Sequence, residues 1–175
     1  MNADLLERAQ RVRLMLFDVD GILTDGTLYI SDSGEAMKGF NVRDGHGLKM
    51  LQESGIEIGV VTSRNSRIVA RRAEELGIAL LKQGVASKHS VVLDLLKERE
   101  LRPEQGGFMG DDLLDLAAMA VCGFSATVPE ASDAVRARVT FVTRAAGGRG
   151  AAREVCELLL DAQGKLDEAV RRHFQ

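Results

Sequence analysis

Short runs of mostly apolar residues mark the expected strands of this 175-residue chain. The clearest are LMLF at 14–17 and IEIGVV at 56–61. A strand that is apolar at every position is typical of a parallel sheet that helices cover on both faces. Shorter runs predict further strands at 78–81, 107–110, 124–128 and 139–142.

Segments with helical spacing alternate with these strands. The segments 41–55 and 66–76 stop at Gly55 and Gly77, as helices commonly do. Further helices are expected within 7–13, 87–102, 112–123, 153–163 and 165–175. This alternation predicts an α/β fold, a Rossmann-like parallel sheet with helices on both faces. In such sheets ligands bind beyond the carboxyl ends of the strands.

The stretch from about 26 to 40 interrupts the alternation. Leu28 and Ile30 alternate with polar residues, and a Ser-Asp-Ser-Gly turn separates them from Met37 and Phe40. The pattern predicts a β-hairpin inserted after the first strand, too short to form a separate lid. We therefore expect one domain over residues 1–175, which ends in a glycine-rich loop and a helical tail at about 143–175.

Composition narrows the classes of function. A formal net charge of −3, one Tyr and no Trp argue against nucleic acid as a partner. No apolar stretch approaches the roughly 20 residues that span a bilayer, and the first residues lack the apolar core of a signal peptide. We expect a cytoplasmic protein without a membrane partner. Cys122 and Cys156 fit no metal-binding spacing and are expected to be reduced, buried thiols.

Two aspartate clusters directly follow apolar runs. Asp18 and Asp20 come after the first strand, and the later GDDLLD segment carries Asp111, Asp112 and Asp115. Carboxylates at the ends of two core strands repel each other unless a cation lies between them, and hard oxygen ligands suit Mg²⁺. Asp-x-Asp-Gly taken alone fits a strand-end turn equally well. Asp112 and Asp115 are expected to cap or support, because acids are favoured in a first helical turn.

Thr62 and Lys88 lie between the two clusters in the sequence. Thr62 ends the second strand, and Lys88 opens a helix, where the dipole disfavours a cation. A bound phosphoryl group would explain both residues. A strand-ending threonine and a solvated lysine are the commoner readings of each residue alone, but the combination with the two aspartate clusters is far more specific.

At these positions the chain resembles the haloacid dehalogenase (HAD) superfamily of phosphohydrolases. The four motifs of that superfamily stand here as DVDGILTD at 18–25, Thr62, Lys88, and GDDLLD at 110–115. The resemblance implies that Asp18 is the nucleophile, which forms an aspartyl-phosphate, and that Asp20 is the general acid–base. It further implies that Thr62 and Lys88 bind the phosphoryl group. Mg²⁺ would be held by Asp18, the Asp20 carbonyl and Asp111.

A narrower resemblance links the chain to the 3-deoxy-D-manno-octulosonate 8-phosphate phosphatases. It rests on the hairpin and on the segments FNVRDGHGLKML, RRAEELGI and VTRAAGGRGAAREVCELLL. The resemblance implies Mg²⁺-dependent hydrolysis of that sugar phosphate to 3-deoxy-D-manno-octulosonate (KDO) in lipopolysaccharide precursor synthesis. It also implies a capless homotetramer with shared active sites, built around the hairpins. The loop with Gly148 and Arg149 would close a neighbour's site, although a flexible loop before the last helix is the alternative.

Arg64 bears on the choice of substrate. In the families that the chain resembles, arginine at this position goes with octulosonates and glutamate with nonulosonate 9-phosphates, and arginine suits the carboxylate of a sugar acid. The resemblance places His46, in a glycine-flanked loop, near the hairpin base as a substrate contact, although a loop histidine without a role is the alternative. Ser63 and the SKHS segment depart from the commonest pattern. A nonulosonate 9-phosphate phosphatase or a broader sugar-phosphate phosphatase therefore stays an alternative.

Two other classes of protein fit less well. A receiver-like signalling domain also combines aspartates, a threonine, a lysine and Mg²⁺, but it has a lone acceptor aspartate where this chain has Thr62. A catalytically inactive scaffold would have no need of the complete set of Asp18, Asp20, Lys88 and Asp111. An enzyme is the expectation from the sequence.

Overall fold

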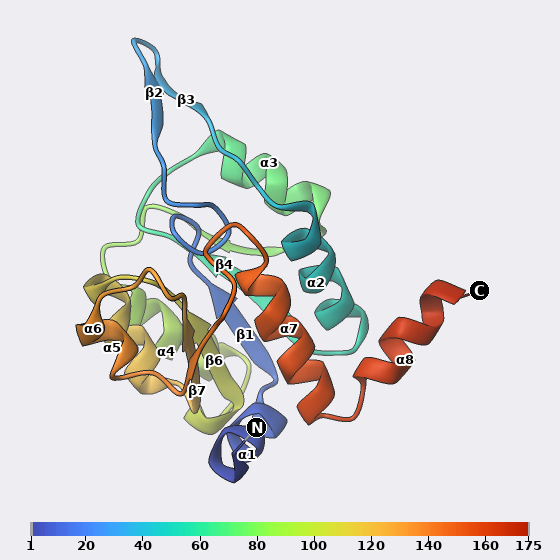
Figure 1. Cartoon of the computed structure of the whole chain (residues 1–175). Coiled ribbons are helices and arrows are strands. Elements are labelled where there is room, and N and C mark those ends of the chain that lie inside the picture. Colours follow the sequence, from blue (N-terminus) through green and yellow to red (C-terminus); the bar gives the residue numbers. More distant parts are fainter. Residues whose placement is uncertain (1, 175) are drawn as a thin grey trace.

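The computed structural model describes residues 2–174 and has a six-stranded parallel sheet at its centre (Figure 1). The strand order is β5-β4-β1-β6-β7-β8. The strands are β1 (Leu14–Phe17), β4 (Glu57–Val61), β5 (Leu80–Lys82), β6 (Gly106–Met109), β7 (Phe124–Thr127) and β8 (Phe141–Val142). The parallel sheet confirms the predicted α/β architecture. The strand order reverses between β1 and β6, and ligands in such sheets bind at the carboxyl ends of the strands at this point.

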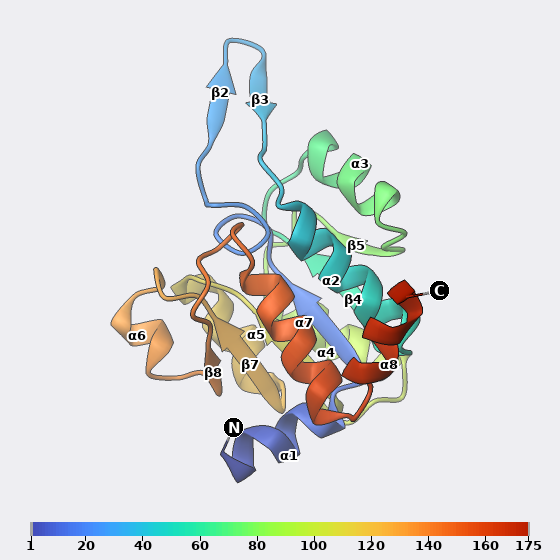
Figure 2. The same ribbon diagram turned by 45° about the vertical axis from the view of Figure 1, so that its right-hand side comes forward.

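Helices cover both faces of this sheet. On one face α2 (Val42–Glu53) and α7 (Ala151–Ala162) lie side by side, while α4 (Lys88–Glu98) and α5 (Leu116–Val121) pack together on the other (Figure 2). The remaining helices are α1 (Ala3–Arg11), α3 (Arg67–Glu75), α6 (Asp133–Arg136) and α8 (Leu166–Arg171). Short 3₁₀ turns span Pro103–Gln105, Leu113–Asp115 and Arg172–Phe174. Among the described residues, no helix has both the length and the apolar character to cross a membrane.

Burial explains why the central strands are apolar throughout. All four residues of β1 are buried, as are the last four of β4 and all of β6. Their side chains project alternately toward the two helical layers, so none of these buried positions faces water, and only Glu57 at the start of β4 is exposed. Cys156 is buried in this core and Cys122 is partly buried, both as free thiols, as expected.

The inserted hairpin consists of β2 (Tyr29–Ser31) and β3 (Gly34–Met37), an antiparallel pair inside the predicted range 26–40. It projects from the body of the molecule (Figure 2). Apolar side chains on it face solvent in this chain, with Ile30 69% and Met37 54% exposed. The hairpin therefore adds almost nothing to the core of its own chain.

The segment RDGHG forms the first turns of α2, which confirms the helix predicted over 41–55 and not the loop expected around His46. Asn41 caps this helix by accepting the N–H of Arg43 at 2.8 Å. A Cβ at Gly47 would lie 2.9 Å from Cδ and 3.1 Å from Cα of Arg153 on α7. Gly47 is thus a point of close contact between two packed helices.

Candidate active site

The residues that follow three neighbouring strands meet at one edge of the sheet. Asp18 follows β1, Thr62 follows β4 and Asp111 comes two residues after β6, and β1 pairs in parallel with both other strands. The N–H of Asp18 donates to the carbonyl of Met109 at 2.9 Å, which continues the ladder to the site. These residues line a cavity of about 240 Å³ together with Asp20, Ser63, Arg64, Lys88, Asp112, Leu114 and Asp115. The convergence expected from the sequence is therefore present.

Lys88 connects two buried carboxylates at the bottom of this cavity. Its Nζ lies 2.8 Å from Oδ2 of Asp18 and 2.6 Å from Oδ1 of Asp115. Burial alone would lower the pKa of Lys88, but the two carboxylates outweigh it and raise this pKa, so the ammonium stays charged. A positive charge at the start of α4 interacts unfavourably with the helix dipole. The two carboxylates offset this cost for Lys88.

Asp115 uses both carboxylate oxygens within the protein. Oδ1 binds Lys88, and Oδ2 accepts the N–H groups of Asp111 and Asp112, both at 3.1 Å. A Cβ at Gly110 would lie 2.4 Å from Cγ of Asp115, so only glycine fits there. Asp112 is exposed and accepts the N–H of Leu113 at 2.7 Å. Both side chains thus have hydrogen-bond partners within the protein, and their supporting role stays a prediction.

The carboxylates of Asp18, Asp111 and Asp115 fit a divalent cation, since each offers an oxygen and these oxygens lie within 4.8 Å of one another. Burial, followed by the neighbouring Asp18 and Asp115, raises the pKa of Asp111 to about 7. Burial also raises the pKa of Asp18 to about 6, although Lys88 opposes this shift. Carboxylates whose charge is so poorly compensated gain from a bound cation, which agrees with the predicted Mg²⁺ cofactor.

Gly21 makes room for Asp111. A Cβ at Gly21, whose φ is +83°, would lie 2.0 Å from Oδ2 of Asp111. The glycine after Asp20 therefore serves both the turn of the chain and the approach of the second cluster to the first.

Asp20 is held by residues that the sequence did not single out. The ammonium group of Lys38 donates to Oδ1 of Asp20 and forms an ion pair with Glu35 at 3.1 Å. The Lys38 side chain is only 1% exposed. Glu35 in turn accepts the hydroxyl of Ser66, the N-cap of α3. The hairpin thus reaches back into the site, where it contacts the expected acid–base residue.

Oδ2 of Asp20 is buried and accepts no hydrogen bond from the described residues, while Nε of Arg64 lies 3.7 Å away. Because the Arg64 side chain is 48% exposed, its guanidinium can pair with a ligand in the cavity. Arg64 is therefore placed where the prediction of a substrate contact requires it.

The backbone donor of Thr62 is already used by the sheet. Its N–H donates to the carbonyl of Lys82 at 2.9 Å, as part of the β4–β5 edge. Its hydroxyl oxygen lies 3.4 Å from the N–H of Arg64. Only the hydroxyl group of Thr62 is available to a phosphoryl oxygen, because the sheet already uses the backbone donor.

Three residues that were expected to contact substrate lie outside this cavity. His46 faces Arg153 and His173, with its Nδ1 3.0 Å from Nη1 of Arg153. Gly148 packs behind the Asp20 turn, and Arg149 lies 3.8 Å from Asp25 beside a second cavity of about 340 Å³ that also reaches Asp111. Their substrate-binding roles stay predictions, for which a single chain provides no contact.

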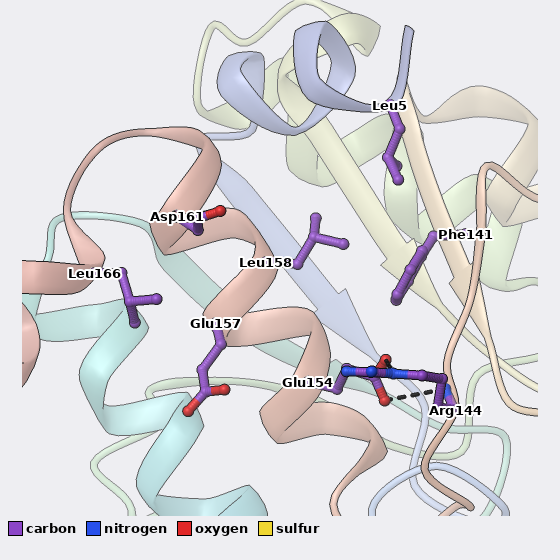
Figure 3. A pocket seen from close by; sticks show the side chains of 8 residues that line it. All are labelled: Leu5, Phe141, Arg144, Glu154, Glu157, Leu158, Asp161 and Leu166. Carbon is purple, nitrogen blue, oxygen red and sulfur yellow. Dashed lines mark hydrogen bonds and ion pairs between the residues drawn. The ribbon is translucent and has the colours of Figure 1, made fainter. Parts of the chain in front are cut away.

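Another cavity, of about 340 Å³, is lined by residues of α1, β8, α7 and α8 and shares no residue with the cavity of the active site (Figure 3). Its lining combines Leu5, Phe141, Leu158 and Leu166 with three acidic residues and Arg144. Glu154 pairs with this arginine at 3.2 Å. With its one cation neutralised and a largely acidic rim, this cavity does not suit a phosphate group.

Comparison with known proteins agrees with this geometry. No family model matches the chain. The 3-deoxy-D-manno-octulosonate 8-phosphate phosphatase of Escherichia coli is 46% identical over 169 residues, which cover 97% of this chain and 90% of that protein. A HAD superfamily (subfamily III A) hydrolase from Legionella pneumophila superposes with a TM-score of 0.93 at 37% identity, covering 98% of this chain and 94% of that one.

The 3-deoxy-D-manno-octulosonate 8-phosphate phosphatase of Moraxella catarrhalis, solved with magnesium, phosphate and KDO, superposes with a TM-score of 0.95 at 39% identity over the full length of both chains. Fold and site together define a phosphatase of the HAD superfamily. Within it, the chain belongs to the family of 3-deoxy-D-manno-octulosonate 8-phosphate phosphatases.

Proposed function

We propose that the chain hydrolyses 3-deoxy-D-manno-octulosonate 8-phosphate to KDO and phosphate, with Mg²⁺ as cofactor. The observation that carries the proposal is the meeting of Asp18, Lys88 and Asp111 at one sheet edge, in a cavity that Arg64 also lines. The E. coli relative bears the name of this activity, and the Moraxella relative was solved with magnesium, phosphate and KDO.

In the first proposed step, a carboxylate oxygen of Asp18 attacks phosphorus. The bond between phosphorus and the sugar oxygen breaks, an aspartyl-phosphate forms, and protonated Asp20 gives its proton to the leaving oxygen. Lys88 orients Asp18 through the 2.8 Å contact and balances charge on the transferring group. KDO leaves with the proton from Asp20.

In the second step, water attacks phosphorus of the aspartyl-phosphate. Asp20, now ionised, takes the proton of the water, and the bond from phosphorus to the Asp18 oxygen breaks. Phosphate is released, Asp18 is a carboxylate again and Asp20 is protonated for the next turnover. Lys38 keeps Asp20 directed at the cavity in both steps.

Asp18, the Asp20 carbonyl and Asp111 are proposed to hold the Mg²⁺, with Asp112 and Asp115 in support. Bound there, Mg²⁺ supplies positive charge to the phosphoryl oxygens. Asp115 is assigned to support because Lys88 and two N–H groups already occupy its oxygens. The hydroxyl of Thr62 is proposed to donate to a phosphoryl oxygen.

The substrate assignment depends on Arg64 and is tested by comparing two substrates. The expected result is a kcat/KM for the octulosonate 8-phosphate at least about tenfold (~1.4 kcal/mol) above that for a nonulosonate 9-phosphate, because in the families that the chain resembles arginine at this position goes with octulosonates. Arg64→Glu should reverse or erase this preference. Equal kcat/KM values for both substrates in the wild type would refute the narrow assignment, and full activity of Asp18→Asn would refute the mechanism.

The exposed hairpin supports a proposal about assembly. Residues 1–175 are proposed to form one domain, and four copies to associate through the hairpins into a homotetramer that works in the cytoplasm in lipopolysaccharide precursor synthesis. Exposed Leu28, Ile30 and Met37 form an apolar surface that such contacts would bury. Ile30→Asp should therefore lower the mass measured by light scattering, whereas Val170→Asp, at an exposed position of α8, should not.

A further inference from the structure

Asp44 is a buried carboxylate that lies outside the cavity and joins two helices. Its side chain projects from the first turn of α2, and the residue is 2% exposed. Oδ1 accepts the N–H of Arg153 at 2.8 Å, and Oδ2 accepts the N–H of Gly150 at 3.1 Å. Both donors belong to the start of α7, where N–H groups have no partner within the helix. Asp44 therefore caps α7 from a neighbouring helix.

The segment just before α7 packs backbone against backbone on the Asp20 turn. The N–H of Gly148 donates to the carbonyl of Ile22 at 2.8 Å. A Cβ at Gly147 would lie 1.9 Å from the carbonyl oxygen of Gly21, and one at Gly148 would lie 2.5 Å from the carbonyl carbon of Thr24. No side chain separates the two segments, so a displacement of one displaces the other.

This turn carries the chemistry of the site. It begins directly after Asp20, and its N–H groups at Ile22, Leu23 and Thr24 all donate to the carbonyl of Val19. Gly21 within it leaves the space that Asp111 occupies. Gly147 and Gly148, called the glycine segment below, thus pack against and support the turn that orients Asp20 and adjoins Asp111.

From these contacts we propose that Asp44 is a positioning residue of the phosphatase. By capping α7, it holds Gly147 and Gly148 against the turn, and the turn in turn fixes Asp20 and the space for Asp111. The proposal rests on the function proposed above. Asp44 itself touches neither the cavity nor the aspartates of the site.

The chemistry of the cap explains why the residue is an aspartate. The two N–H groups of Gly150 and Arg153 require two acceptors, and a carboxylate supplies both. An asparagine supplies one acceptor and turns its NH₂ group toward the other N–H. Asp44→Asn therefore removes one contact at almost constant volume, which makes it the informative variant.

The test compares Asp44→Asn with two other variants. Gly148→Ala displaces the glycine segment directly and leaves the cap intact. Gln163→Ala is the matched control, because Gln163 fixes the opposite end of α7 to the carbonyls of Ala9 and Val12 at 3.2 and 2.9 Å. The measurements are amide hydrogen exchange at 145–149, Mg²⁺ affinity by calorimetry, and kcat for the octulosonate 8-phosphate well below the melting temperature.

Asp44→Asn and Gly148→Ala are each expected to increase exchange at 145–149, to weaken Mg²⁺ binding, and to lower kcat about 10- to 100-fold, since a shift near 1 Å has such effects. The double variant should lose no more than the worse single variant. Gln163→Ala should lower the melting temperature without these changes.

Three outcomes would overturn the proposal. The first is that Asp44→Asn exchanges faster at 145–149 but keeps its kcat and Mg²⁺ affinity. The second is that Asp44→Asn loses activity without a change in exchange at 145–149. The third is that Gln163→Ala loses kcat and Mg²⁺ affinity to the same extent as Asp44→Asn. If Asp44→Asn fails to fold, Gly148→Ala decides, and wild-type kinetics with that variant would refute the role of the segment. An inactive wild type would instead refute the proposed function, and exchange and calorimetry would still decide on Asp44.

Discussion

Nζ of Lys88 lies 2.6 Å from Oδ1 of Asp115, in an ion pair whose two side chains are 5% and 1% exposed. The same ammonium group contacts Asp18 at 2.8 Å, so one cation balances two buried anions. Removing one of these three residues leaves a buried charge without a partner. This destabilises a protein far more than replacing all three residues by apolar ones.

Lys88→Met is therefore expected to abolish activity and to lower the free energy of unfolding at pH 7.5 by about 3–5 kcal/mol. The loss should shrink at pH 5, because Asp18, whose pKa is about 6 even beside Lys88, is then protonated in the variant. Urea unfolding at both pH values in metal-free buffer measures this. Lys97→Met on the exposed side of the same helix is the control, and a loss that is independent of pH would contradict the argument.

Magnesium affinity is expected to depend on pH through Asp111. The pKa of this carboxyl is raised to about 7 in the metal-free protein, so Mg²⁺ must displace a proton at lower pH. Affinity should be constant well above pH 7 and fall about tenfold per unit below it, more steeply once Asp18 also protonates near pH 6. Calorimetry from pH 8 to 5.5 in buffers of different ionisation enthalpy would report the released proton. A flat profile would exclude this coupling.

Asp111→Asn is expected to lose Mg²⁺ binding and yet to stabilise the metal-free protein. A carboxyl whose pKa is higher in the folded than in the unfolded chain weakens folding as pH rises from about 4 to 7. At pH 8 the full penalty applies to the wild type, so the variant should melt at least about 2–4 °C higher. At pH 4 the two proteins should differ little. Calorimetric scans at both values, with and without Mg²⁺, test this, and a less stable variant at pH 8 would refute it.

Lys38→Met is expected to lower kcat about 10- to 100-fold, because Asp20 then loses the contact that directs it at the cavity. Mg²⁺ affinity should change little, since Asp111 and Asp18 are untouched. Steady-state kinetics with the octulosonate 8-phosphate measure the loss. Lys49→Met, on the exposed side of α2, provides the control for the change of charge. Wild-type kcat in Lys38→Met would show that the hairpin contributes nothing to Asp20.

The sheet and the main site residues were predictable because their signals are local. The apolar run 14–17 coincides with β1, and the hairpin lies inside the expected range. Strand ends in a parallel sheet share one edge, so the positions of Asp18, Thr62 and Asp111 followed from order alone. The short α6 gave no helical signal, because four residues are too few to show a period.

The network around Asp20 was not predictable for a different reason. Lys38 follows an exposed strand in a polar stretch, where a lysine is ordinarily solvated. Its burial results from the path of the hairpin back over the cavity, which no sequence period encodes. The helix over 41–55 was predicted correctly, but the loop expected around His46 was wrong, because Gly47 serves close contact between α2 and α7, a property of the tertiary structure.

The hairpin connects the active site at its base with an exposed apolar surface near its tip. Lys38 at the base pairs with Asp20, while Ile30 at the far end offers apolar surface to solvent. A contact that restricts the motion of one end also restricts the hairpin as a whole. Binding at the two ends is therefore thermodynamically coupled, and such coupling is reciprocal. A neighbouring chain that covers Ile30 would stabilise the pair of Lys38 and Asp20. A ligand that binds at Asp20 and Lys38 would then raise the affinity for that neighbour by the same factor.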